Sequence, residues 1–106
     1  MTPEDEKLFT LARAARARIQ ALQGAAVRDD TGRSYTGATV NLPSLSVSAL
    51  DMAVAQALVS GARGLEGAVV VGGDLPDIDA LQDLGGSGVA VWHCDSRGQV
   101  LAEVTS

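Results

Sequence analysis

The spacing of apolar residues along this chain alternates between a helical and an extended period, which predicts a mixed α/β protein. Between Pro3 and Leu22, apolar side chains recur at steps of three and four, as on one face of a helix. Thr2 is a suitable N-cap, Pro3 suits the first helical position, and Asp5 stands where a capping box needs an acid. We expect Gly24 to end this helix. Its apolar stripe consists of Leu8, Leu11, Ala12, Ala15, Ile19 and Leu22.

The next segment predicts a β-hairpin followed by a second helix. The hairpin should run from Gly24 to Asn41, with its turn at residues 29–32, where an Asp-Asp-Thr-Gly sequence suits a tight reversal. Residues 42–44, Leu-Pro-Ser, should break the return strand. The second helix is expected over residues 46–62, capped by one of the serines at 44, 46 or 48. It is apolar nearly all round, which is typical of a central helix buried on more than one side.

The last third of the chain predicts two strands, a short helix and a closing hairpin. Residues 67–72 form a β-branched run between glycines, typical of a buried strand. A third helix is expected over residues 77–84, with Asp74 as its cap. Residues 89–94 should be a strand that pairs with residues 99–104 through an Asp-Ser-Arg-Gly turn. The order α-β-β-α-β-α-β-β favours a three-layer α/β/α arrangement, and we expect one domain over residues 1–106.

Composition narrows the classes of partner and compartment. Apolar residues make up 46% of the chain and aromatic residues only 3%, so the core must consist of Ala, Val and Leu. The net charge is −5, and we therefore expect no nucleic-acid partner, because such proteins carry a concentrated basic face. A single cysteine permits no intramolecular disulfide. We expect no signal peptide, because the amino terminus is acidic, and no membrane span, because no apolar run is long enough. A cytoplasmic protein without membrane contact is expected.

The first hairpin and the second helix carry a resemblance to the short cytidine deaminases. The motif in the hairpin is Gly24-Ala25-Ala26-Val27, then Gly32-Arg33-Ser34-Tyr35-Thr36-Gly37, then Val40-Asn41. The first hairpin of the short cytidine deaminases has a similar strand, a similar acidic glycine turn and an aromatic-x-Gly return strand. Ser48-Ala49-Leu50 occupies the position where the zinc-binding helix of those enzymes begins. The resemblance implies a mixed five-stranded sheet in a cytidine deaminase-like fold. It also implies assembly into dimers or tetramers through the region of the second helix.

The resemblance fails at the residues that carry the family's chemistry. In these enzymes zinc acidifies a bound water, and a glutamate on the helix moves the proton. The resemblance places the first zinc ligand at Ser48, the glutamate at Leu50 and the two cysteine ligands at Asp77 and Ala80. The ribose-contacting positions fall on Thr39 and Asn41. We therefore expect a vestigial pocket with no catalytic residues, no metal ligands and no cofactor. That pocket comprises Thr39, Asn41, Ser48, Leu50, Asp77 and Ala80.

No other set of residues in the chain can replace the zinc ligands. His93 is the only histidine and Cys94 the only cysteine, and they are neighbours on a predicted strand. Adjacent strand residues point to opposite faces, so one metal cannot easily use both, and no third soft ligand exists. We interpret Cys94 as a buried strand residue, His93 as half-exposed, and Trp92 as a core or interface anchor.

For the other clusters of polar and glycine residues we favour a structural role over a functional one. Asp51, Asp77 and Asp79, with Ser48 and Asn41, could gather around Mg²⁺ or Ca²⁺, but acids near helix starts commonly stabilise the helix instead. A basic patch is another possibility, although a solvated helix face suits an acidic chain better. The glycine-rich segments match no phosphate-binding spacing and are interpreted as turns. The residues of the possible basic patch are Arg13, Arg16, Arg18, Arg28 and Arg33.

Three functional hypotheses remain. The leading one is a deaminase-fold protein without zinc-dependent deamination, serving as a binding, assembly or regulatory module and forming homo-oligomers. The second is a nucleoside-related enzyme with altered, non-zinc chemistry in the same pocket. The third is a regulatory partner of another protein, with no small ligand.

Overall fold

The computed structural model describes residues 1–106 as three helices and seven strands. The first half holds α1 (Pro3–Arg18), β1 (Gly24–Asp29), β2 (Ser34–Ala38), β3 (Val40–Leu42) and β4 (Leu45–Val47). The second half holds α2 (Ala49–Val59), β5 (Leu65–Val71), α3 (Asp79–Gly85), β6 (Ala90–Cys94) and β7 (Val100–Thr105). No helix is long and apolar enough to cross a membrane.

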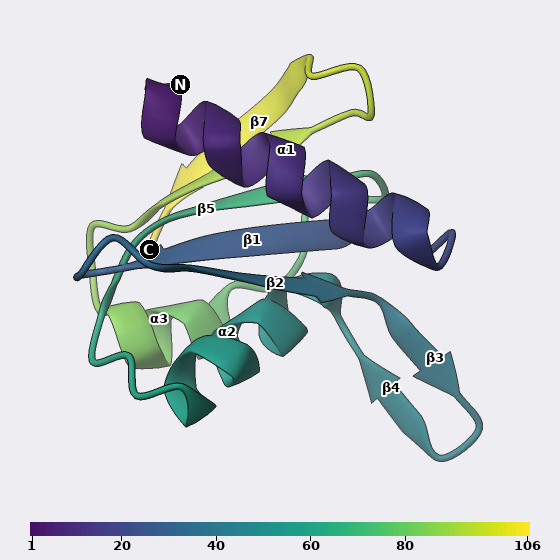
Figure 1. Ribbon diagram of the computed structural model, residues 1–106, viewed down its shortest axis with the longest axis horizontal. Helices are drawn as coiled ribbons and strands as arrows, with labels where there is room; N and C mark the ends of the chain where they lie inside the picture. Colours follow the sequence, from purple (N-terminus) through teal and green to yellow (C-terminus); the bar gives the residue numbers. More distant parts are fainter.

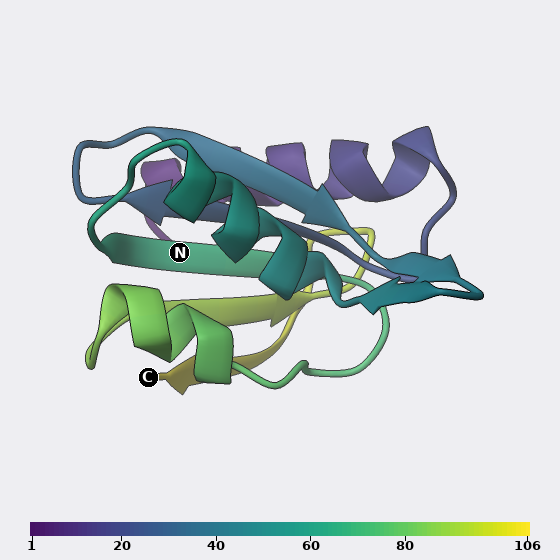
Figure 2. The same cartoon turned by 90° about the horizontal axis from the view of Figure 1, so that it is seen from below.

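The central sheet is five-stranded and mixed, as the resemblance implied. Its strand order is β2-β1-β5-β6-β7. Only β5 and β6 run parallel, and the other neighbours pair antiparallel. Helix α1 covers one face of the sheet and helices α2 and α3 cover the other, which gives the predicted α/β/α layers (Figure 1). Figure 2 shows α2 and α3 side by side on their common face.

The core is built from small side chains in two layers. Fourteen buried residues lie between the sheet and the α2–α3 layer, among them Leu50, Val54 and Leu81. Six lie beneath α1, including Leu8, Ala12 and Cys94. At Gly24, a Cβ atom would collide with the backbone of α1, so the absence of a side chain lets β1 pass directly under the helix. The expected Ala, Val and Leu core is confirmed.

Helix α1 is shorter than its apolar stripe predicts. The prediction extended it to Leu22, but the helix ends at Arg18, and Gln20 takes a left-handed conformation with φ 52°. The backbone N–H of Ala21 donates to Arg16 instead of continuing the regular ladder. Ile19 and Leu22 are consequently exposed, and Gly24 is the first residue of β1 rather than the helix stop.

A second hairpin was missed by the sequence interpretation. The return strand does not continue to Val40, because Thr39 bonds through its backbone N–H and its hydroxyl group to the backbone of Gln23. The chain then leaves the sheet as β3 and returns as β4, paired from Val40↔Val47 to Leu42↔Leu45. This β3–β4 hairpin projects from one end of the domain (Figure 1).

The two later helices also differ from their predictions. Helix α2 begins after Ser48 and buries only one side, and its Val59 is 79% exposed. It is therefore one element of an outer layer and not a helix enclosed on several sides. Helix α3 begins at Asp79 with no side-chain cap, so the capping role predicted for Asp74 is wrong. The carboxylate of Asp77 instead accepts from the backbone N–H of Asp79 at 2.7 Å.

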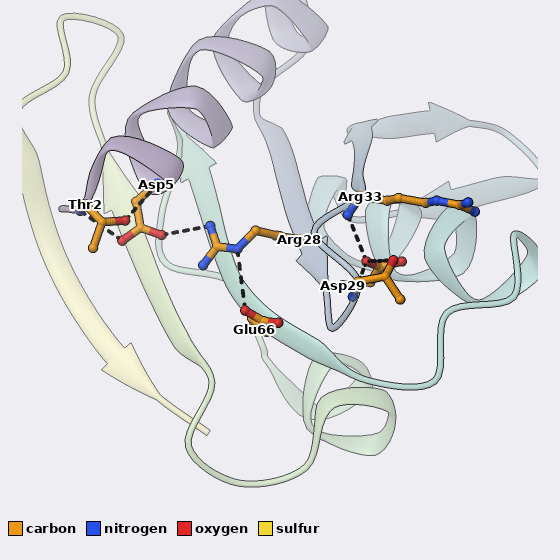
Figure 3. Close-up of polar contacts among 7 residues, drawn as sticks. Thr2, Asp5, Arg28, Asp29, Arg33 and Glu66 are labelled. Carbon is orange, nitrogen blue, oxygen red and sulfur yellow. Dashed lines mark hydrogen bonds and ion pairs between the residues drawn. The ribbon is translucent and has the colours of Figure 1, made fainter.

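The arginines do not form one basic patch. The Arg28 guanidinium lies 3.3 Å from a carboxylate oxygen of Asp5 and 4.0 Å from one of Glu66, which pins the start of α1 to the sheet (Figure 3). Arg28 and Arg33 lie near the end of β1 that is next to the start of α1. Arg16 and Arg18 lie in the last turn of α1. The possible patch is thus divided between the two ends of the helix.

Candidate functional site

A cavity lies at the end of the sheet where β5 leads into α3, in the region where the resemblance predicts a pocket. It has a volume of about 410 Å³. Its walls come from the start of β1, the base of the β3–β4 hairpin, the first turn of α2 and the loop before α3. We call it the acidic pocket. It is lined by Leu22, Gln23, Thr39, Ser46, Val47, Ser48, Asp51, Asp74, Leu75, Pro76 and Asp77.

Three of the six predicted pocket residues line this cavity, namely Thr39, Ser48 and Asp77. Asn41 instead lines a neighbouring groove between the hairpin and the segment after α1. Ala80 lines a groove between α2 and α3. Leu50 is fully buried in the core under α2, so it does not plug the pocket.

The polar groups of those three residues are used locally. The Ser48 hydroxyl accepts from the backbone N–H of Asp51 at 3.1 Å and caps α2. The Thr39 hydroxyl accepts from the backbone N–H of Gln23 at 3.0 Å. The Asp77 carboxylate accepts a hydrogen bond from the backbone N–H of Asp79. Each side chain therefore stabilises a chain reversal or a helix start at the rim of the pocket.

A buried polar brace, which sequence reasoning missed, holds the loop after β5. Gln23 is only 7% exposed, and its Nε2 donates to the carbonyl of Gly72 at 2.9 Å and also to that of Asp74. His93 is 5% exposed, and its Nε2 lies 3.0 Å from the carbonyls of both Gly72 and Gly73. The expectation that His93 is half-exposed is wrong. A lone glutamine between Leu22 and Gly24 gives no sequence signal of this role.

The lining of the pocket contains three aspartates and no arginine, lysine or histidine. Burial raises the pKa of Asp51, the carboxylates of Asp77 and Asp79 raise it further, and the hydrogen bond with Ser48 opposes this. Between Ser34 and Ser96 the chain holds one arginine, Arg63, and no lysine, and Arg63 lines a different cavity.

The residues present do not fit a zinc ion. Cys94 is fully buried beneath α1, where burial and then the charge of Asp95 raise the pKa of its thiol. His93 turns to the loop on the other side of the strand. No three histidine, cysteine or acidic side chains converge on a common point. The last finding also covers Asp51, Asp77 and Asp79, so these three carboxylates do not make the hard-cation site considered from the sequence.

Comparisons with known proteins agree with the fold. The model of the cytidine deaminase-like family matches residues 1–98. A cytidine deaminase from Burkholderia pseudomallei is 26% identical, with a TM-score of 0.79, over 99% of this chain and 93% of that one. The cytidine deaminase from Mycobacterium tuberculosis is 24% identical (TM-score 0.73, 85% of each chain), and that from Mycobacterium leprae 22% (TM-score 0.73, 94% and 91%). Among curated proteins, none matches the chain.

Proposed function

Because this chain belongs to the cytidine deaminase-like family, we propose that it is a deaminase-fold module that lacks zinc-dependent hydrolytic deamination and serves in binding and assembly. The similarity to solved deaminases supports the scaffold. It does not carry the activity, since function depends on the site rather than on the fold.

One observation carries the proposal, namely the set of side chains at the positions that the resemblance assigns to the metal and to the proton carrier. Ser48 caps α2, Leu50 is packed in the core, and Ala80 has no ligand atom. A catalytic zinc site needs three protein ligands of the His, Cys or carboxylate type around an open position. Without such a set, no group lowers the pKa of an attacking water, and leucine cannot deliver a proton.

The test is zinc content together with ammonia release. The protein is purified after expression with added zinc and analysed by elemental mass spectrometry, and cytidine is supplied as the substrate. We expect far less than one zinc per chain and no ammonia above the background rate. One zinc per chain, or ammonia from cytidine, contradicts the proposal.

A matched variant checks the placement of the lost ligands. Ser48→Cys, Asp77→Cys and Ala80→Cys together restore three thiolates at the expected positions. We expect this variant to bind zinc, because the resemblance implies that these three positions hold the family's ligands and because thiolates suit that ion. Zinc binding by the variant and not by the parent supports both the placement and the loss. If the variant folds but binds no zinc, the placement is wrong.

The assembly part of the proposal is supported by an uncharged surface around the β3–β4 hairpin. No charged residue occurs between Ser34 and Leu50, and Leu42 and Leu45 are 59% and 51% exposed. Ile19 and Leu22 lie across the adjoining groove of about 650 Å³ and are also exposed. A two-stranded hairpin is marginally stable by itself in water, and exposed apolar patches mark contact sites.

We propose a second copy of this chain as the partner on that surface. Two copies that each carry a net charge of −5 repel one another least where both are uncharged. The proposed contact thus lies at the hairpin rather than along α2, although Leu58 and Val59 at the end of α2 are exposed as well.

Sedimentation velocity tests the assembly. We expect the parent to sediment as a dimer or larger species, and the double variant Leu42→Asp with Leu45→Asp to sediment as a monomer. Leu101→Asp is the control, because Leu101 is 53% exposed on β7, at the opposite edge of the sheet from β2, and we expect it to leave assembly intact. A monomeric parent, or a double variant that assembles like the parent, contradicts this contact.

A further inference from the structure

We propose that a small pocket between the end of α1 and the turn before β7 binds the phosphoryl group of a small phosphate monoester. This pocket has a volume of about 250 Å³, and we call it the basic pocket. The inference goes beyond the proposed function, because it concerns a different cavity and requires neither zinc nor its absence. The basic pocket is lined by Arg13, Arg16, Ala17, Gln20, Ala21 and Ser96.

The first argument is that the fold holds Arg16 in place while part of its guanidinium group stays unused. A Cβ atom on Gly24 would lie 2.8 Å from Cβ of Arg16, and one on Gly72 would lie 2.9 Å from Cζ, so this side chain crosses two glycines. Its Nε donates to the carbonyl of Ala21 at 3.2 Å. Its two Nη atoms donate to no protein group, and both ion pairs of the protein belong to Arg28. Arg16 therefore offers a ligand two donor groups on a fixed side chain.

The second argument is another guanidinium group at the same pocket, also without a carboxylate partner. Cζ of Arg13 lies 5.2 Å from the centroid of the Phe9 ring, which is a cation–π contact. No acidic side chain lines the basic pocket. The carboxylate of Asp95, which precedes Ser96, accepts from N–H groups of its own turn. In a chain of net charge −5, these two arginines leave a local excess of positive charge that attracts an anion.

The third argument is the glutamine at the bend after α1. The helix ends in a Schellman motif, in which the N–H of Ala21 donates to the carbonyl of Arg16 at 3.0 Å. Glycine is usual at the position that Gln20 occupies, since its φ is 52°, and no other residue except glycine has a positive φ here. Strain of this kind is found at ligand sites. The amide of Gln20 makes no hydrogen bond within the protein, so it adds an unused donor to the lining.

These groups together indicate the class of ligand. Guanidinium groups only donate hydrogen bonds, and their planar fork matches the oxygens of phosphate and carboxylate groups. Two positive charges suit a phosphate monoester, which carries nearly two negative charges at neutral pH, better than a carboxylate with one. The hydroxyl of Ser96 makes no hydrogen bond within the protein and can donate to a third oxygen. The volume of about 250 Å³ suits a phosphoryl group with a small substituent.

The test is a titration of the full chain with methyl phosphate at about pH 7.5, where this ester carries nearly two negative charges. Binding is followed by NMR at constant ionic strength, through the backbone amide signals and the arginine Nε–H signals. We expect saturable shifts centred on Arg16, Gln20 and Ser96, with the signals of α2 and α3 unchanged. Acetate should bind at least about tenfold more weakly, because it carries one charge.

Two variants of equal net charge separate a specific site from general attraction. Arg13→Gln removes an arginine of the basic pocket, whereas Arg18→Gln removes one that lies in the last turn of α1 and lines no cavity. We expect Arg13→Gln to weaken methyl phosphate binding about tenfold, equal to about 1.4 kcal/mol. Arg18→Gln should stay within about twofold of the parent.

A third variant tests the role of the planar fork. Arg16→Lys keeps the positive charge but loses the paired donors, so we expect it to weaken methyl phosphate binding about fivefold. Circular dichroism checks that this variant is folded. Arg13→Gln decides the question if it is not, because Arg13 is exposed.

Several results would overturn this inference. Shifts that do not saturate or that centre elsewhere do so, and equal losses for Arg13→Gln and Arg18→Gln would indicate only diffuse attraction. Acetate that binds as tightly as methyl phosphate, or a folded Arg16→Lys that binds like the parent, contradicts the assignment to a phosphoryl group. Stoichiometric zinc in the purified parent would instead overturn the proposed function and leave this inference standing.

Discussion

The turn between β1 and β2 offers the sharpest test of how this fold is held together, because one buried carboxylate organises it. Asp29 is 2% exposed. One of its oxygens accepts from the backbone N–H of Thr31 at 2.9 Å, from its hydroxyl at 2.8 Å and from the N–H of Arg33 at 2.9 Å. Its other oxygen accepts from the Tyr35 hydroxyl at 2.9 Å. Figure 3 shows Asp29 and Arg33 at this turn.

Replacing Asp29 should be costly at neutral pH. Hydrogen bonds to a charged group contribute about 1.5–3 kcal/mol each, but the exposed amides of Thr31 and Arg33 regain water when the carboxylate is lost. We therefore expect Asp29→Ala to lower the free energy of unfolding by about 3 kcal/mol rather than by the full sum. Asp29→Asn keeps one acceptor and should cost about 1.5 kcal/mol.

The dependence on pH gives the same site a second signature. Burial raises the pKa of Asp29, but the hydrogen bonds from Thr31, Tyr35 and Arg33 lower it by more, from 3.8 to about 2. A lowered pKa in the folded state means that the stabilisation is complete above the unfolded value and is lost as the pH falls toward about 2. The gap in stability between the parent and Asp29→Asn should therefore be widest above about pH 4 and should narrow below it.

Urea unfolding followed by circular dichroism measures this gap at neutral pH and at several acid values. Asp95→Asn is the matched control, because Asp95 holds the turn before β7 in the same way, with Oδ1 accepting from Arg97 N at 2.9 Å and Gln99 N at 3.0 Å. It lacks the hydroxyl partners, so we expect a loss of about 0.5–1 kcal/mol. Equal losses for the two variants at neutral pH, or a gap for Asp29→Asn that is constant with pH, would refute the reasoning.

Two further predictions concern the packing and capping of α2. A Cβ on Gly37 would lie 2.5 Å from the carbonyl oxygen of Ala49 and 2.7 Å from Cβ of Met52, so Gly37→Ala should push α2 off β2 and cost about 2–3 kcal/mol, measured by urea unfolding. An unchanged midpoint would show that the helix can shift freely. Ser48→Ala removes the hydroxyl that accepts from Asp51 N and should cost about 1 kcal/mol, whereas Ser48→Thr should largely retain the cap in the same assay.

Much of the fold follows from local patterns, and the failures have physical causes. The strand at residues 67–72 and both turns were predictable, because β-branched runs and Asp-x-x-Gly sequences act over a few residues. The end of α1 was not, because the apolar stripe continues past the point where Gln20 turns left-handed. Ile19 and Leu22 continue the helical spacing in the sequence, but they lie outside the helix and are exposed on the surface.

The β3–β4 hairpin was hidden for a different reason. Its strands have three residues each, too few for a period to stand out, and the Pro43-Ser44 turn looks like a simple break. The hairpin depends on Thr39 bonding to Gln23, a contact between residues 16 positions apart. Contacts of that range cannot be deduced from local spacing.

The pocket shows the same limit from the side of function. The resemblance placed Thr39, Ser48 and Asp77 in one pocket, and all three line one cavity. It could not reveal that each of these side chains accepts a hydrogen bond from a nearby backbone N–H group. Once those groups are accounted for, the lining keeps the carboxylates of Asp51 and Asp74. A chain 26% identical to a solved deaminase shares its fold, but the fold alone does not decide the chemistry of a site, which depends on the side-chain groups that line it.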